Sequence, residues 1–372
     1  MADDPIPESD RIEGAPHPRE TLHLIGQSQA EAAFLDAHTR GKQHHAWLIT
    51  GPLGVGKATL AWRIARFLLS QPTDTGMFAP EPYTTLATPT DHPVTRRTMA
   101  MSEPGLFLLR RPWDDRAKAL KTVISIEEAR KLKDFFGLSA PDGRHRVVII
   151  DSADEMNTST ANAILKLLEE PPARCTLLLV SHTPSRLLPT IRSRCRTLRC
   201  VPLSPVDMAT ALAATGEAIE SPEALAELAG GSVGGALRLV HLDGLRLYHS
   251  LARLLDGAPD IDRPALLTLA NSLLGRANAP RLDLTLGLLD TLMARLARTG
   301  TGLPPAADIA KGETAMLHRL SPDARAARQW ADLQQALSAR ATHGRAVNLD
   351  PSALILDMGL QINQTAAQIL RA

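Results

Sequence analysis

The stretch AWLITGPLGVGK, residues 46–57, decides the fold of this chain. Residues 46–50 form a short apolar run that ends at a Gly-Pro pair, which is typical of a buried strand. Residues 57–69 repeat apolar side chains at helical spacing and predict a helix. Residues 51–57, between the strand and the helix, match the phosphate-loop pattern G-x-x-x-x-G-K in the structural context that this pattern requires.

The chemistry expected of this loop is phosphate binding. Glycines let several backbone N–H groups converge on a phosphate, the start of the helix adds positive potential, and the lysine reaches the β- and γ-phosphates. A second apolar run, VVIID at residues 147–151, ends in an aspartate of the kind that orders the magnesium shell around a nucleotide. The residues expected to form the nucleotide site are Gly51, Gly54, Val55, Gly56, Lys57, Ala58, Thr59 and Asp151.

Two residues that ATP hydrolysis requires are missing from this site. Ala58 follows the lysine, where a serine or threonine hydroxyl would hold Mg²⁺. Thr59 comes one residue later, about 100° around the helix, and cannot take over that role. Ser152 follows the aspartate where an active ATPase of this kind carries an acidic residue, and serine is a poor general base. Asp154 and Glu155 are interpreted as a solvated helix start. We therefore expect ATP or ADP to bind weakly or not at all.

Strands and helices alternate through the first 200 residues. Strands are predicted at 46–50, 147–151, 176–180 and 197–201, and helices at 29–40, 57–69, 126–136 and 158–169. This alternation predicts an α/β fold, a parallel sheet with helices on both faces. After residue 203 the patterns are helical only. The predicted domains are a disordered tail (1–20), a P-loop core (21–202), a small helical lid (203–243) and a larger all-α domain (244–372). Residues 71–105 are predicted to be a loop-rich insertion.

Composition excludes several classes of protein. The net charge of +1 lacks the basic excess of a dedicated DNA-binding protein. Three cysteines without a C-x-x-C pair exclude a zinc module or a disulfide framework, so we expect no metal site. The N-terminus has no apolar stretch, and no run of about 18 apolar residues is present to span a membrane. These features predict a cytoplasmic protein.

Two longer motifs carry a resemblance to a known family. Residues 162–172 read NAILKLLEEPP, and residues 187–195 read LLPTIRSRC. Both closely resemble motifs of the bacterial DNA polymerase III clamp-loader subunits, which are AAA+ proteins. The resemblance covers about residues 20–240. It implies a AAA+ P-loop module, a helical lid at 203–243, and a C-terminal helical collar at 244–372 that holds a five-membered ring together.

The resemblance also distinguishes between two types of subunit. Motor subunits of the tau/gamma type keep the Mg²⁺-binding threonine, the acidic residue after the Walker B aspartate, and an arginine in a G-S-x-R-D-A-L lid motif. Here Ala58, Ser152 and Gly234 stand at those three positions. Residues 70–140 contain no cysteine, so the four-cysteine module of the motor subunits is also absent. Some delta-prime proteins carry that module too, so its absence departs from both types. The three catalytic departures imply the delta-prime type, a stator that does not hydrolyse ATP.

The resemblance implies one active residue. Arg194 lies in the Ser-Arg-Cys motif, and in this family that arginine acts in trans as an arginine finger on the γ-phosphate held by the neighbouring motor subunit. Such a finger is worth about 10³–10⁵ in rate. The alternative interpretation is an ordinary surface ion pair. Cys195 and Ser193 are interpreted as residues that shape the loop.

The implied function is that of a delta-prime subunit that helps to load the sliding clamp onto primed DNA. It would be part of a DNA-directed DNA polymerase holoenzyme without being an enzyme itself. The implied partners are the tau/gamma and delta subunits, the sliding clamp through a weak contact, and primer–template DNA through the complex, with no membrane. Two alternatives remain: an ATP-hydrolysing tau/gamma-type motor that uses Thr59 and Asp154, and an unrelated P-loop regulator.

Overall fold

The computed structural model of the chain describes residues 6–12, 15–41, 44–72, 83–137, 144–216, 219 and 221–371. The chain divides into two compact units, Met1–Ala218 with Gly230–Leu237, and Ile219–Ala229 with Arg238–Ala372. Residues 203–243, the predicted lid, therefore contribute to both units. Parts of the predicted tail (1–5, 13–14) and of the predicted insertion (73–82) lie outside the described residues. Within the described ranges, no helix is long and apolar enough to cross a membrane.

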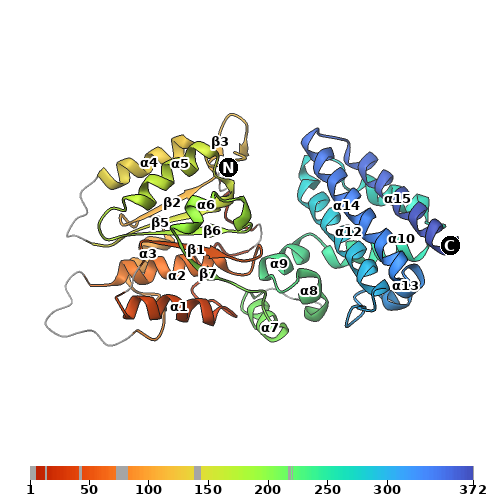
Figure 1. Cartoon of the computed structure of the whole chain (residues 1–372), viewed down its shortest axis with the longest axis horizontal. Coiled ribbons are helices and arrows are strands. Elements are labelled where there is room, and N and C mark those ends of the chain that lie inside the picture. The colour runs from red at the N-terminus through yellow and green to blue at the C-terminus, as the bar shows by residue number, and fades with distance from the viewer. Residues whose placement is uncertain are drawn as a thin grey trace. The chain divides into compact units, whose positions relative to one another are not determined.

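A five-stranded sheet forms the centre of the first unit (Figure 1). In the order of their pairing, its strands are β2 (Leu106–Arg110), β5 (Arg146–Asp151), β6 (Cys175–Ser181), β1 (Ala46–Thr50) and β7 (Arg196–Arg199). All neighbouring pairs are parallel, so the carboxyl ends of the strands meet at one edge. A short antiparallel hairpin, β3 (Trp113–Asp114) with β4 (Ala119–Leu120), follows β2.

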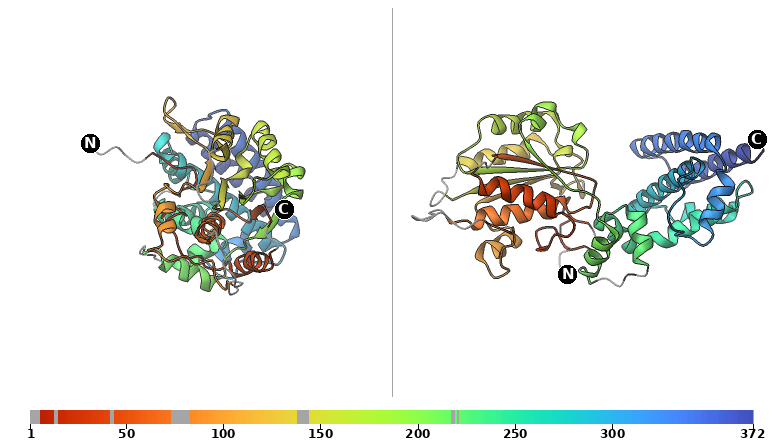
Figure 2. Two further views of the ribbon diagram at one scale, coloured as in Figure 1. Left: turned by 90° about the vertical axis from the view of Figure 1, so that its left-hand side faces the viewer. Right: turned by 60° about the horizontal axis from the view of Figure 1, so that its bottom comes forward.

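Helices cover both faces of this sheet (Figures 1 and 2). One face carries α1 (Ser28–Thr39), α2 (Lys57–Ser70) and α3 (Pro93–Met99), and the other carries α4 (Ile126–Gly137), α5 (Thr158–Glu169) and α6 (Pro189–Ser193). Two 3₁₀ turns, Ala153–Glu155 and Pro184–Arg186, follow β5 and β6. The predicted α/β fold class, with a parallel sheet between two layers of helices, is confirmed.

The continuous apolar runs form strands because both faces of the sheet are buried. Every residue of β6 is buried, and Val147–Ile150 of β5 have no exposed surface. Helix α5 adds Ile164 and Leu168 to the core from one face, at the helical spacing that its sequence shows. A strand covered on both sides must be apolar throughout, which is why these runs do not alternate with polar residues.

Beyond residue 203, the described part of the chain contains helices and turns but no strand, as predicted. The helices are α7 (Pro205–Ala213), α8 (Pro222–Ala229), α9 (Val233–His241), α10 (Gly244–Asp256), α11 (Arg263–Asn271), α12 (Ala279–Gly300), α13 (Glu313–Leu320), α14 (Ala324–Ala346) and α15 (Pro351–Arg371), with a 3₁₀ turn at Arg276–Asn278. In the second unit, α12 packs along α14, and α11 packs along α15.

A buried polar network joins α10, α12 and α13 in the second unit. The Glu313 carboxylate, whose side chain is fully buried, accepts hydrogen bonds from Tyr248 Oη and from Arg295 Nε at 2.8 Å. It also accepts the backbone N–H groups of Ile309 at 2.8 Å and Ala310 at 3.1 Å. A second carboxylate, Glu227, is 3.0 Å from Arg295 Nη1. The network satisfies an arginine and a glutamate inside a helical core, where either alone would be costly.

The structure differs from the predictions in two segments. Helix α3 lies within residues 71–105, which the sequence predicts to be a loop-rich insertion, and strand β2 begins directly after that stretch. Residues 6–12 and 15–20, which we predicted to be part of a disordered tail, instead form ordered ion pairs. Glu8 pairs with Arg19 at 2.5 Å and with Arg110 at 2.9 Å. The prediction failed because acidic and proline-rich composition cannot reveal cationic partners 100 residues away.

Candidate functional site

The phosphate loop lies between β1 and α2, and its backbone requires glycine. Gly54 and Gly56 have φ values of +76° and +100°, in the left-handed region that other residues rarely adopt. At Gly51, a Cβ atom would lie 2.4 Å from the carbonyl oxygen of Cys200. These glycines therefore set the shape of the loop, whether or not a phosphate binds there. Val55, within the loop, is buried, and Ala58 and Thr59 follow Lys57 in the first turn of α2.

Lys57 is turned onto its own loop. Its side chain is buried, and Nζ donates to the carbonyl oxygens of Gly51 at 2.7 Å and Pro52. Burial lowers the pKa of Lys57 to about 8, against the opposing charges of Cys200, Asp151 and Asp154. To contact a phosphate, the Lys57 ammonium group would first have to break these two hydrogen bonds to the loop.

Asp151, the predicted magnesium-shell residue, is buried at the carboxyl end of β5. Burial raises its pKa to about 7, and the nearby carboxylates of Asp10 and Glu155 act in the same direction, while Lys57 and Arg110 oppose them. This carboxyl group is therefore harder to ionise than an ordinary aspartate. Magnesium ligands must be ionised, so Asp151 in this environment is a poor one. As arranged, the residues present do not fit a magnesium–nucleotide complex.

Asp154 corrects one interpretation made from the sequence. It is not part of a solvated helix start, because Oδ1 accepts the Ser181 hydroxyl at 2.7 Å and Oδ2 accepts the backbone N–H of His182. Glu155 pairs with Arg111 at 2.8 Å. Asp154 therefore holds the turn after β6, and both of its oxygens already have donors. This arrangement speaks against its acting as a substitute catalytic base.

Residues 231–235 close over the phosphate loop, which the sequence analysis did not foresee. Ser232 Oγ donates to the Leu53 carbonyl at 2.8 Å, and the Gly234 N–H donates to the Gly54 carbonyl at 3.1 Å. A Cβ atom on Gly54 would lie 2.4 Å from Ser232 Oγ. The segment thus packs directly on the tip of the loop. The only sequence signal was the loss of the lid arginine at Gly234.

The N-terminal segment also reaches this site. The Asp10 side chain is fully buried, forms an ion pair with Arg110, and lies 3.1 Å from His17 Nε2. Burial opposes the ionisation of Asp10, but the hydrogen bond from His17 and the charge of Arg110 outweigh it and lower its pKa. Arg110 is paired in register with Asp151 on the neighbouring strand. A fixed carboxylate therefore lies at the carboxyl ends of β2 and β5, beside Asp151.

Arg194 lies at the C-terminal end of α6, outside the phosphate loop. Its side chain is 38% exposed, forms an ion pair with Glu169 Oε1 at 2.9 Å, and donates to the Thr190 carbonyl at 3.1 Å. Glu169 is the last residue of α5, within the motif at residues 162–172. Arg194 therefore forms the surface ion pair of one interpretation and also has the exposure that the arginine-finger interpretation requires. Exposed pairs of this kind contribute only about 0–1 kcal/mol, so Arg194 is readily released.

Within the described ranges, no cluster of three or more His, Cys, Asp or Glu side chains could hold a metal ion. The three cysteines are free thiols. Burial raises the pKa of Cys175 and Cys195 to about 12 and that of Cys200 to about 11, with Lys57 partly offsetting the effect at Cys200.

We expect these thiols to be unreactive in the native chain. At pH 8 a thiol of pKa about 11 is only about one part in a thousand thiolate, and the thiolate is the nucleophile. Alkylation by iodoacetamide should be at least about a hundredfold slower than in the urea-unfolded chain, and should accelerate as pH rises. Mass spectrometry identifies which thiol is labelled. Rapid native labelling of any of the three would contradict the burial described above.

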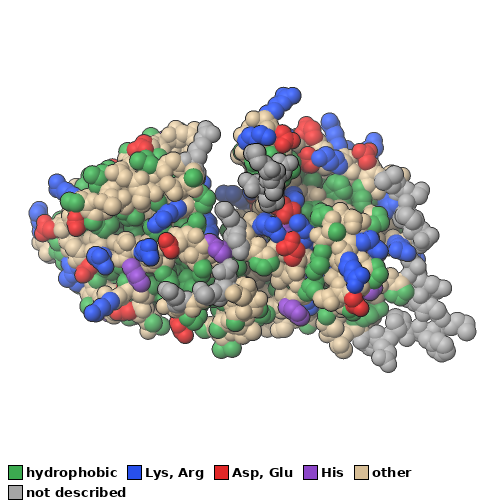
Figure 3. All heavy atoms as spheres, turned by 180° about the vertical axis from the view of Figure 1, so that it is seen from behind, with side chains coloured by type: hydrophobic (Ala, Val, Ile, Leu, Met, Phe, Trp, Pro, Cys, Tyr) green, Lys and Arg blue, Asp and Glu red, His purple; other side chains and the backbone are tan. Residues whose placement is uncertain are grey.

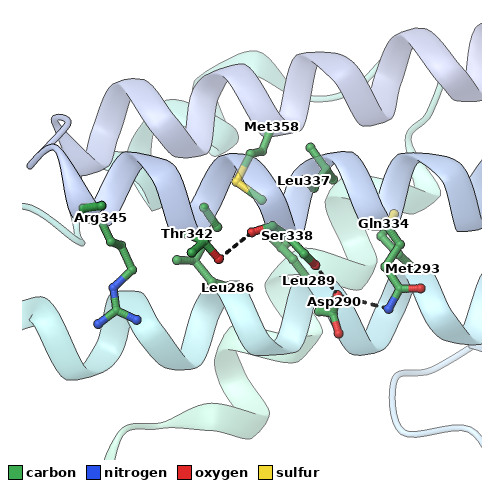
Figure 4. Close-up of a pocket in the computed structure, with 12 residues that line it drawn as sticks. Leu286, Leu289, Asp290, Met293, Gln334, Leu337, Ser338, Thr342, Arg345 and Met358 are labelled. Atoms are coloured by element: carbon green, nitrogen blue, oxygen red, sulfur yellow. Dashed lines mark hydrogen bonds between the residues drawn. The ribbon is translucent and has the colours of Figure 1, made fainter. Parts of the chain in front are cut away.

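The second unit contains a hollow of about 560 Å³ between α12 and α14, closed on one side by Met358 (Figure 4). Its floor is apolar, with Leu289, Met293 and Leu337, and its rim is polar. On that rim, Asp290 Oδ1 accepts Gln334 Nε2 at 3.0 Å and Ser338 Oγ at 2.8 Å. The Asp290 carboxylate therefore links α12 to α14.

Charge is distributed without one dominant basic surface on the face drawn in Figure 3. Lysine and arginine side chains are interspersed there with aspartate and glutamate over both units. This pattern agrees with the net charge of +1. A phosphate-backbone contact, if the chain makes one, depends on a few local residues.

Comparison with known proteins shows what the P-loop unit is similar to. Residues 26–204 match the family model described as DNA polymerase III, delta subunit. DNA polymerase III subunit delta' of Pseudomonas aeruginosa is 34% identical over 219 residues, which are 59% of this chain and 61% of that protein. DNA polymerase III subunit gamma of Buchnera aphidicola subsp. Schizaphis graminum is 30% identical over 192 residues, 51% of this chain and 47% of that one.

The chain thus spans about half to three-fifths of the length of these curated relatives. Among solved structures, a gamma-subunit-related protein from Thermotoga maritima aligns over 90% of this chain and 99% of that one, with 16% identity and a TM-score of 0.40. The predicted resemblance to the DNA polymerase III clamp-loader subunits, and to the delta' type among them, is confirmed by the sequence matches.

Proposed function

We propose that this chain, whose residues 26–204 match the family model described as DNA polymerase III, delta subunit, is the non-hydrolysing delta'-type stator of a clamp loader. One observation carries the proposal: the phosphate loop keeps its glycine backbone but lacks the means of hydrolysis. Ala58 has no hydroxyl for Mg²⁺, and Ser152 replaces the acidic residue. The raised pKa of Asp151 and the closed geometry of Lys57 support the same conclusion.

The second part of the proposal concerns Arg194. A stator without its own ATP site contributes to turnover only by completing the site of a neighbour. The partly exposed guanidinium of Arg194 lies at a helix end, and its partner Glu169 is half exposed. A phosphate at an intersubunit boundary would compete well with that carboxylate, because it carries more negative charge and binds a guanidinium with equally good geometry. Arg194 would then stabilise the charge that develops on the transferring phosphoryl group.

The partners proposed are the tau/gamma and delta subunits, with primer–template DNA and the sliding clamp contacted within the assembled loader. The C-terminal helices of the second unit are proposed to form the collar that joins the subunits. A role in replication is consistent with the cytoplasmic location that the sequence predicts, and we propose that location. Nucleotide is proposed to be bound weakly or not at all, and no zinc is required.

Reconstitution tests the assignment. The isolated chain, incubated with ATP and Mg²⁺, is expected to show no hydrolysis above buffer. Mixed with tau/gamma and delta subunits, it should co-elute in one complex whose ATPase activity is stimulated by primed DNA and clamp. Hydrolysis by the isolated chain that is lost in Lys57→Ala would favour the motor alternative. Failure to co-elute with either subunit would favour an unrelated P-loop regulator.

A further inference from the structure

We propose that the N-terminal strap, defined as residues 6–12 and 15–20, is an internal occupant of the phosphate-loop site. We further propose that Ile12, packed on Gly234, determines that this site excludes purine nucleotides. The inference rests on the proposed function in taking the loop for a former nucleotide site. It goes further by assigning the exclusion to residues outside the loop and outside the hydrolytic positions.

The first observation is the contact between Ile12 and Gly234. A Cβ atom on Gly234 would lie 2.4 Å from Ile12 Cδ1 and 3.1 Å from Gly54 Cα. Ile12 therefore fills the space in which a side chain at position 234 would begin, directly beside the tip of the phosphate loop. The Gly234 N–H, which donates to the Gly54 carbonyl, joins the two backbones at the same point.

The second observation is that the strap crosses the carboxyl ends of the strands. Asp10 is bound to Arg110, the last residue of β2, and Arg110 is in register with Asp151 at the end of β5. Ligands of parallel α/β sheets bind at this edge. The strap thus places a buried carboxylate at this edge, at the end of β2 and close enough to Asp151 on β5 to raise its pKa.

The third observation is that the strap is fastened to the helix that begins at the phosphate loop. Arg66 of α2 donates to the carbonyl oxygens of Arg19 at 2.9 Å and Thr21 at 3.2 Å. His17 has no exposed surface and meets the Trp62 ring edge to face at 6.0 Å between centroids. Together with the Asp10–Arg110 ion pair, these contacts hold the chain on both sides of Ile12, so Ile12 is not a loose side chain.

An internal occupant acts as a competitor that is always present. The apparent affinity for nucleotide falls in proportion to the fraction of molecules in which the strap is displaced. Because Lys57 Nζ also donates to two loop carbonyls, a nucleotide would have to displace Ile12 and release the lysine. Removing the strap abolishes the first of these costs and leaves the glycine loop itself intact.

The test is binding of a fluorescent ADP analogue, N-methylanthraniloyl-ADP, to the isolated chain at several salt concentrations. Two variants release the strap: Ile12→Ala, and deletion of residues 2–12. The matched control is Ile6→Ala on the same strap, because Ile6 is 64% exposed. We expect wild type and Ile6→Ala to bind barely or not at all, and both release variants to bind at least about tenfold more tightly. Lys57→Ala in the deletion background should abolish the gained binding.

Circular dichroism establishes that each variant is folded. If the deletion variant is unfolded, the binding measured for Ile12→Ala alone tests the inference, because that variant keeps Asp10 and its ion pairs. The inference is overturned if a folded release variant binds no more tightly than wild type, or if the gained binding survives Lys57→Ala. Either result would leave the stator proposal intact, because that proposal is tested by assembly and by the ATPase activity of the reconstituted loader.

Discussion

Replacing Arg194 with alanine is expected to lower, by about 10³-fold or more, the turnover of the one ATP site that this subunit completes in a reconstituted loader. The reason is electrostatic. The transferring phosphoryl group spreads charge over its equatorial oxygens, and a guanidinium placed against them stabilises that charge in a site from which water is excluded. Turnover at that site should be measured under single-turnover conditions, with primed DNA and clamp present, so that the other sites of the ring do not mask the loss.

The ion pair with Glu169 supplies a matched control. Glu169→Gln removes the partner of Arg194 but keeps the arginine, and an exposed pair contributes only about 0–1 kcal/mol. We therefore expect this variant to assemble normally and to retain turnover within a few-fold of wild type. Arg194→Lys should recover little, because an ammonium group cannot make the bidentate contact of a guanidinium.

Two results would contradict the arginine-finger role. One is an Arg194→Ala complex that elutes as wild type and turns over at the wild-type rate. The other is an equal loss in Arg194→Ala and Glu169→Gln, which would show that the ion pair matters only for the structure of the α5–α6 region. Loss of assembly in Arg194→Ala would instead indicate a role in the subunit contact.

Replacing Glu313 with alanine is expected to destabilise the second unit by about 3–5 kcal/mol. The change removes the acceptor of Tyr248, of Arg295 and of two backbone N–H groups at once, and leaves the buried Arg295 guanidinium without its closest counter-charge. Arg295 would keep only the partly exposed Glu227 as a counter-charge, so loss of its buried partner, more than loss of one contact, accounts for the size of the effect. Urea unfolding followed by circular dichroism measures this loss of stability. In the variant, we expect the second unit to unfold at a lower urea concentration than the first unit.

Glu227→Ala is the matched control for this prediction. Glu227 binds the same arginine at 3.0 Å, but its side chain is 45% exposed, so water replaces it at little cost. We expect a loss below about 1 kcal/mol. Equal losses in the two variants would mean that burial does not set the energetics of the network, and a small loss in Glu313→Ala would mean that Arg295 finds another acceptor.

Local sequence was sufficient to predict most of the sheet. The runs at 46–50, 147–151 and 176–180 became β1, β5 and β6 within one residue at each end, because strands buried on both faces must be apolar throughout. Strand β2 was not predicted. Of its residues Leu106–Arg110, one is buried and the other four are partly buried, and the strand lies at the edge of the sheet after a proline-rich stretch. Its apolar pattern is therefore short and mixed.

By itself, the sequence determined the phosphate loop, the missing hydrolytic residues at Ala58 and Ser152, and the motifs that identify the family. Each of these depends on residues adjacent along the chain, so spacing alone reveals it. Only the tertiary structure decided how the site is filled: Gly234 and Ile12 meet at the loop, Asp10 reaches Arg110, and Asp154 binds the turn after β6. Those contacts join residues about 30 to 220 positions apart, and their energy comes from burial and charge pairing that exist only once the sheet has brought its strand ends together.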